Sequence, residues 1–261
     1  MSDCVKVLAS AVAVFLCGVL CQADEPAGDA PQPSADELLR GVWSRFPSEP
    51  ILISGELLVR GRRGSEPALR LDLKADWGKN PVLAAYTISD DTGVVLERMT
   101  VTRRAAGAPE YLYERGNPLK QETTPDLAAT IGRTDLSWMD LTLSFLWWPR
   151  PEITGTDEVK GRECYVITVN APPGSDTQYA RVLLWIDREL GMFLQAEGYD
   201  ASGERVRRLW IQSLKKISER WMIKDLEVQA YPGMGRTKLL VRSLKVGGTE
   251  TVEPGVLEGD R

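Results

Sequence analysis

Residues 68–77 read Ala-Leu-Arg-Leu-Asp-Leu-Lys-Ala-Asp-Trp, and apolar and charged side chains alternate along this stretch. Leu69, Leu71 and Leu73 fall on one face of an extended chain, and Arg70 and Asp72 fall on the other. This alternation is typical of a strand that turns one face to the core and one to water, as antiparallel sheets do. The stretch therefore predicts a strand in a two-faced antiparallel sheet.

Strand patterns continue on both sides of this stretch. The spacers between them are short and carry turn chemistry, as in Asp90-Asp-Thr-Gly93 and Asp200-Ala-Ser-Gly203, where glycine supplies the positive φ of a hairpin turn. Such spacers are too short for parallel crossovers. We therefore expect a mainly β (α+β) protein with one curved antiparallel sheet. Its further strands are expected at residues 51–60, 82–89, 94–103, 110–115, 152–158, 163–170, 178–187, 192–199, 204–217, 220–230 and 236–246.

The segment 122–149 interrupts the strands and is expected to cover the dry face of the sheet as a helical insertion. Thr124-Pro125 and Gly132 frame a short helix in this prediction. A second helix is predicted over 137–148, with Ser137 and Asp140 as its N-cap pair. This helix is apolar on nearly every side, which indicates burial. It is also too short for a bilayer, which needs about 20 residues. It therefore lies against an apolar surface or faces an apolar ligand.

The N-terminal residues indicate export. An apolar run at residues 7–21 has the length of a signal-peptide core, and the small residues around Ala23 suit cleavage there. A lipoprotein signal is disfavoured because leucine precedes Cys17 and Cys21, and an uncleaved anchor is the other alternative. Residues 24–34 are then a disordered linker, rich in proline, alanine and acids. A capping box, Ser34-Ala-Asp-Glu37, begins an amphipathic helix that ends before Pro47.

The composition excludes several classes of mechanism. The chain has 261 residues and no histidine, so Ser-His-Asp and Cys-His nucleophiles and histidine-ligated metal sites are excluded. Of four cysteines, three leave with the signal peptide, and Cys164 in a strand pattern is expected to be a small buried hydrophobe. The net charge is −5, which argues against a nucleic-acid partner. We expect no catalytic residue, metal or cofactor.

The sequence contains no convincing catalytic or phosphate-binding motif. Ser213-Leu-Lys-Lys216 matches the S-x-x-K pattern, but it falls within a strand pattern, whereas the catalytic motif needs a helix start. No glycine-rich phosphate loop is present. A carboxylate-based hydrolase stays open, because its two acids can be distant in sequence.

Several stretches together resemble the family of outer-membrane lipoprotein-sorting (LolA-like) periplasmic proteins. They are residues 134–148, 161–166, 182–187, 197–200, 220–225 and 236–238. The resemblance implies a curved, unclosed half-barrel of about eleven strands, with an N-terminal helix and a helical lid over a hydrophobic cavity. It also implies an arginine on an early strand that takes part in binding, for which Arg60, Arg62, Arg63 and Arg70 are candidates.

The resemblance implies a periplasmic carrier that holds the acyl chains of lipoproteins or lipids. Its partners would be those chains, an inner-membrane transporter and an outer-membrane acceptor, and we expect a monomer. A lipid-sensing regulator of a membrane signalling protein is the alternative. The domain is expected over 35–246, followed by a disordered tail at 247–261. The residues expected to bind lipid are Trp43, Leu71, Trp138, Met139, Leu141, Leu143, Phe145, Leu146, Trp147, Trp148 and Trp210.

Overall fold

The computed structural model describes residues 32–61, 64–104, 107–175, 177–217, 220–233 and 235–252. All elements below belong to one unit that begins at Pro33. The predicted signal peptide, most of the predicted linker and the end of the predicted tail lie outside the described residues. No helix in these ranges is both long and apolar enough to cross a membrane.

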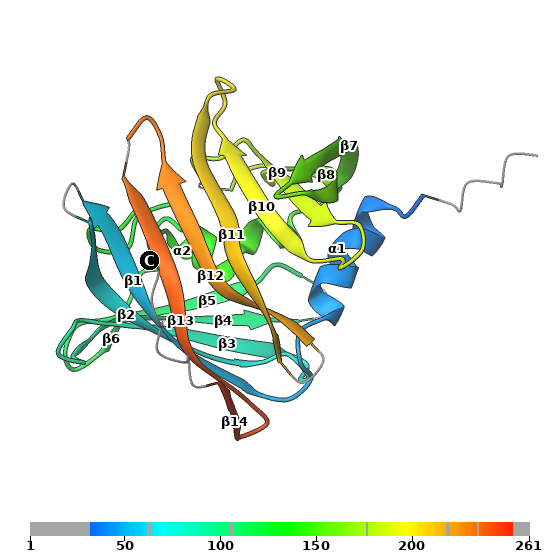
Figure 1. Ribbon diagram of the computed structural model, residues 1–261. Helices are drawn as coiled ribbons and strands as arrows, with labels where there is room; N and C mark the ends of the chain where they lie inside the picture. The colour runs from blue at the N-terminus through cyan, green and yellow to red at the C-terminus, as the bar shows by residue number, and fades with distance from the viewer. Residues whose placement is uncertain are drawn as a thin grey trace, which may run out of the picture. The chain divides into compact units, whose positions relative to one another are not determined.

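The described strands form one antiparallel sheet in the order β6-β5-β4-β3-β2-β1-β13-β12-β11-β10-β9-β8-β7, and β14 pairs with β13. The order ends at β6 and β7, so the sheet is open and curls into a half-barrel (Figure 1). The predicted fold class is confirmed. The strands are β1 Ile51–Gly61, β2 Gly64–Asp76, β3 Val82–Ser89, β4 Val95–Arg103, β5 Glu110–Arg115, β6 Lys120–Glu122, β7 Glu152–Val159, β8 Arg162–Asn170, β9 Arg181–Asp187, β10 Phe193–Tyr199, β11 Arg205–Ile217, β12 Arg220–Ala230, β13 Arg236–Val246 and β14 Thr249–Val252.

The strand count exceeds the eleven that the resemblance implies. Every predicted run forms a strand, and the short strands β6 and β14 are additional. Neither has an alternating pattern, because β6 is polar throughout and β14 lies beyond the last apolar run. Strand β14 also continues the ordered chain past residue 246, where the predicted domain ended.

The alternating leucines of β2 lie on the concave face of the sheet, as the sequence predicts. Leu71 is buried, Leu69 and Leu73 are half-buried, and Asp72 is exposed. Residue Leu71 pairs with Ile88 of β3. Strands β1 and β13, from opposite ends of the chain, pair directly and bring Leu57 opposite Leu239. The concave face of the sheet is therefore a continuous apolar surface.

Helix α1 (Ala35–Ser44) covers part of this concave face. Both hydrogen bonds of its predicted capping box are present: the Glu37 amide donates to Ser34 Oγ at 3.3 Å, and the Ser34 amide donates to the Glu37 carboxylate at 2.8 Å. Leu39 and Val42 on its apolar stripe are buried in the core. The stripe predicted from sequence thus positions the helix against the sheet.

The insertion between β6 and β7 is less helical than the sequence predicts. Residues 124–132 form turns, not a helix, and the predicted helix over 137–148 divides into α2 (Trp138–Thr142) and the 3-10 helix η1 (Ser144–Trp147). The break at Leu143 has a physical reason. A continuous helix with apolar residues on every side would leave some of them in water, whereas the broken one buries Trp138, Phe145 and Leu146.

A second, smaller apolar cluster lies apart from the main core, between β7, β8, β9 and β10. Cys164 on β8 belongs to it and is fully buried, as predicted. Burial, helped by the nearby Asp187 carboxylate, raises the pKa of the Cys164 thiol to about 11. The thiol is therefore protonated at neutral pH, and its role is packing.

Candidate functional site

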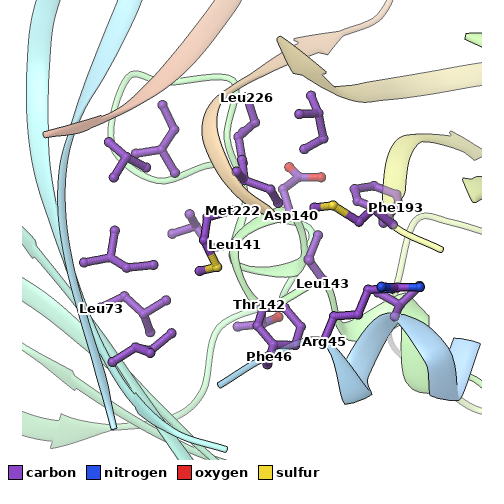
Figure 2. A pocket seen from close by; sticks show the side chains of 18 of the residues that line it. Arg45, Phe46, Leu73, Asp140, Leu141, Thr142, Leu143, Phe193, Met222 and Leu226 are labelled. Atoms are coloured by element: carbon purple, nitrogen blue, oxygen red, sulfur yellow. The ribbon is translucent and has the colours of Figure 1, made fainter. Parts of the chain in front are cut away.

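An apolar cavity of about 150 Å³ lies between the concave face of the sheet, α1 and α2 (Figure 2). Leu73 comes from β2, Phe193 from β10, and Met222 and Leu226 from β12, so both halves of the sheet contribute. Leu141 and Leu143 face them from the insertion. The lining residues are Val42, Trp43, Arg45, Phe46, Ile51, Ile53, Leu71, Leu73, Trp77, Tyr86, Asp140, Leu141, Thr142, Leu143, Met192, Phe193, Leu209, Ile211, Trp221, Met222, Ile223, Leu226, Leu239 and Val241.

The polar groups of this lining are few. Among the described residues that line it, Asp140 is the one carboxylate and Arg45 the one cation. The Tyr86 side chain is buried, and burial raises the pKa of its phenol far above the usual value, so the group stays neutral. The cavity thus presents hydrocarbon and aromatic surface, which favours an apolar occupant.

An aromatic stack forms one wall of the cavity. The Trp43 and Trp147 rings lie 3.5 Å apart between centroids and 12° from parallel. Phe46 follows on Trp43 at 5.3 Å, and Trp77 follows on Phe46 at 4.7 Å. The Arg103 guanidinium lies 3.4 Å from the Trp147 ring centroid, where the negative face of an indole attracts a cation. The stack thus connects α1 and η1 with the ends of β2 and β4.

A buried ion pair joins the insertion to the sheet. The Arg207 guanidinium on β11 lies 2.8 Å from the Asp140 carboxylate on α2, and the side chains are 6% and 3% exposed. Arg207 also donates to the main-chain oxygen of Asp135. The same carboxylate completes the cap of α2, because it accepts from the Ser137 amide at 2.9 Å and from the Ser137 hydroxyl at 2.6 Å. The one acid of the cavity lining is therefore neutralised by Arg207.

Leu143 is held in a strained backbone conformation at the edge of the cavity. Its φ of 49° and ψ of 38° are left-handed, between α2 and η1. A leucine there costs about 1–2 kcal/mol, so the surrounding packing must hold it. The strain turns the chain so that Leu141 and Leu143 both line the cavity.

This strain predicts an inverted order of stability at position 143. The variant Leu143→Gly should have a free energy of unfolding about 1 kcal/mol above that of Leu143→Ala, because both lose the same contacts and only glycine tolerates the left-handed backbone freely. Chemical denaturation of the two variants measures the difference. Alanine as the more stable residue, which is the usual order in helices, would contradict the strained conformation.

The residues expected to bind lipid divide into several groups in the structure. Trp43, Leu71, Leu141 and Leu143 line the cavity. Trp138, Met139, Phe145 and Leu146 are buried in the core behind the lining, Trp147 is in the aromatic stack, and Trp148 packs half-buried on the core. Trp210 alternates with the lining residues Leu209 and Ile211 along β11 and packs instead beneath Arg208 and Arg236.

The predictions from sequence do not include the contribution of β10 and β12 to the cavity, nor the two arginines Arg103 and Arg207 that contact the insertion. Met192, Phe193 and Met222 line the cavity, and the apolar strand patterns around them gave a usable signal. Among the early-strand candidates, Arg60 and Arg70 are exposed and do not line the cavity, while Arg62 and Arg63 lie outside the described residues. Arg207 on the late strand β11 pairs with Asp140 of the insertion, and Arg103 on β4 lies over the Trp147 ring of the insertion.

The chain resembles several solved structures. A DUF1329 family protein from Desulfovibrio piger shares 16% identity at a TM-score of 0.69, over 87% of this chain and 96% of that one. An outer membrane lipoprotein-sorting protein domain from Vibrio parahaemolyticus shares 14% identity at a TM-score of 0.66, over 86% and 95%. A LolA superfamily protein from Nitrosomonas europaea shares 14% identity at a TM-score of 0.63, over 82% and 94%.

No curated protein matches the sequence. A family model described as "uncharacterized protein" matches residues 118–249, just over half of the chain, from the turn before β6 through the insertion to the start of β14. The structural likeness establishes the LolA-like half-barrel as the fold. The chain therefore belongs to the family whose model matches residues 118–249, and it has the LolA-like fold.

Proposed function

We propose that this protein is a periplasmic carrier that binds acyl chains of lipids or lipoproteins in the cavity between the sheet and the insertion. The observation that supports this proposal most directly is the apolar lining of the cavity. Its wall is almost entirely apolar, and its one acid is paired with Arg207. Each methylene group moved from water into such a site gains about 0.8 kcal/mol, so an acyl chain is held without covalent chemistry.

The size of the cavity implies that the insertion moves. An engineered protein cavity of about 150 Å³ holds a benzene molecule, so a volume of this size takes a short part of an acyl chain. A longer chain needs α2 and η1 to shift away from the sheet. The segment from α2 to η1 then acts as a lid, which the Asp140–Arg207 pair and the packing of Trp147 on Trp43 hold closed.

Under this proposal the signal peptide delivers the protein to the periplasm, where it works as a monomer. A membrane transporter would load it and an outer-membrane acceptor would unload it, because release of a buried chain needs a competing apolar site. The likeness to a lipoprotein-sorting domain and a LolA superfamily protein supports this proposal at the level of the fold.

Binding of a neutral apolar fluorophore tests the proposal. N-phenyl-1-naphthylamine should increase its fluorescence with protein purified without detergent, reach saturation at one molecule per chain, and be displaced by fatty acid. Chemically unfolded protein is the control for non-specific adsorption. Folded protein that gives no saturable increase, and from which no endogenous lipid can be extracted, would contradict the proposal.

A further inference from the structure

The lining of the cavity includes one exposed cation, Arg45, at the C-terminal end of α1, for which the described residues offer no anionic partner. Its guanidinium donates through Nε to the Gly191 carbonyl at 3.2 Å, and it makes no ion pair with any described residue. Figure 2 shows Arg45 among the labelled side chains that line the cavity.

The turn between β9 and β10 holds this guanidinium in place. Gly191 has a φ of 57°, and a Cβ atom at this position would lie 2.6 Å from Arg45 Nη2, so the absence of a side chain allows the close approach. The Asp187 carboxylate builds the turn by accepting from the Glu189 amide at 2.9 Å and the Leu190 amide at 2.7 Å. Arg45 is therefore positioned by main-chain contacts although it is exposed.

Two tryptophans of the lining also have indole N–H groups without acceptors among the described residues, and these two atoms are inaccessible behind the cavity surface. The indole N–H groups of Trp43 and Trp77 are buried and have no hydrogen-bond partner within the part of the chain that the structure describes. A buried donor without an acceptor costs about 1–3 kcal/mol, so such groups are usually satisfied by a ligand or water. The one carboxylate of the lining, Asp140, is already bound to Arg207.

Arg45 has no ion pair with a described residue, although the protein as a whole carries more acidic than basic residues. The chain carries a net charge of −5, so a general excess of basic residues does not explain an unpaired arginine at the rim. Hydrogen bonds between a guanidinium and an anionic oxygen are among the strongest in proteins, and arginine matches carboxylate and phosphate in a bidentate geometry. An anionic oxygen at the rim would therefore find a strong donor in Arg45.

We propose that the occupant is an amphiphile with one alkyl chain in the cavity and an anionic head group, carboxylate or phosphate, on Arg45. This inference rests on the proposed function and adds the chemical class of the ligand. The small cavity volume favours one alkyl chain over several.

Displacement of N-phenyl-1-naphthylamine by three ligands of equal chain length tests this inference. Decanoate, decyl phosphate and 1-decanol share the alkyl chain and differ in the head group. At neutral pH and low salt, we expect the better of the two anions to bind at least about ten-fold more tightly than the alcohol, equivalent to about 1.4 kcal/mol. Comparison of the two anions distinguishes a carboxylate from a phosphate head group.

The variant Arg45→Gln should lose this preference, because it weakens the binding of the anions more than that of 1-decanol. Arg40→Gln is the matched control, because Arg40 lies exposed on the same helix, does not line the cavity, and donates to the Asp36 carbonyl. Arg45→Lys should recover part of the preference. The inference is overturned if the alcohol binds as tightly as both anions, or if the two glutamine variants weaken anion binding equally. Failure of all three ligands and of the fluorophore to bind would instead overturn the proposed function.

Discussion

Replacing Arg207 with methionine is expected to lower the free energy of unfolding by about 3–5 kcal/mol, the usual cost of leaving one partner of a buried ion pair unpaired. Asp140 would then be a nearly buried carboxylate without a counter-charge. The effect should also be local. Because the pair joins α2 to β11, amide hydrogen exchange within residues 138–147 should accelerate more than exchange in the strands.

Two further variants distinguish the loss of the buried ion pair from the loss of any arginine. Arg242→Met removes an arginine from β13 whose ion pair with Glu56 is solvent-accessible, and it should cost about 1 kcal/mol or less. Adding Asp140→Asn to Arg207→Met should restore part of the lost stability, since the neutral amide still accepts from Ser137. A cost for Arg207→Met no greater than that for Arg242→Met in urea denaturation would show that the pair does not hold the insertion closed.

Filling the cavity should abolish binding and leave the fold intact. Leu73 lines the cavity from β2 and is half-buried, so the indole of Leu73→Trp would occupy the space proposed for the ligand. We expect the affinity for N-phenyl-1-naphthylamine to fall at least about ten-fold, or about 1.4 kcal/mol. Thermal unfolding should change by only a few degrees, because overpacking costs about 1–3 kcal/mol and the cavity offers room.

Val101→Trp is the matched control for this variant. Val101 on β4 pairs with Ala84, is also half-buried and packs on the same core, but it does not line the cavity. Its tryptophan should leave the affinity for the fluorophore within about two-fold of that of the unaltered protein. Equal loss of binding in both variants would assign the effect to a general disturbance of the core, and unchanged binding in Leu73→Trp would place the fluorophore elsewhere.

The features that sequence predicts well here are local. Alternation in β2 depends on a period of two, and the capping box at Ser34 depends on residues three positions apart, so both are visible in a single stretch. Pairing within β1–β6 and within β7–β13 also follows from the short spacers, whereas the β1–β13 pair joins distant segments and does not. These patterns gave the fold class and the four lining residues Trp43, Leu71, Leu141 and Leu143.

The features that sequence does not reveal depend on contacts between distant segments. The break at Leu143 has no glycine or proline to signal it, and it is stabilised by burial against strands far along the chain. Arg207 lies in a run of basic residues that resembles a solvated strand face, and only the folded sheet shows it inside, against Asp140. Trp210 likewise faces away from the cavity because of the register of β11. The composition of the strand does not determine which of its two faces lines the cavity.

Native mass spectrometry of the exported protein, purified from the cell envelope without detergent, tests the central claim most directly. The account predicts a population with one bound molecule, which is released on unfolding and identified as an amphiphile with an alkyl chain. The same preparation of Leu73→Trp should be empty. Wild-type protein that is empty in the native spectrum, yields no lipid on extraction and fails to take up decanoate or N-phenyl-1-naphthylamine would contradict the account.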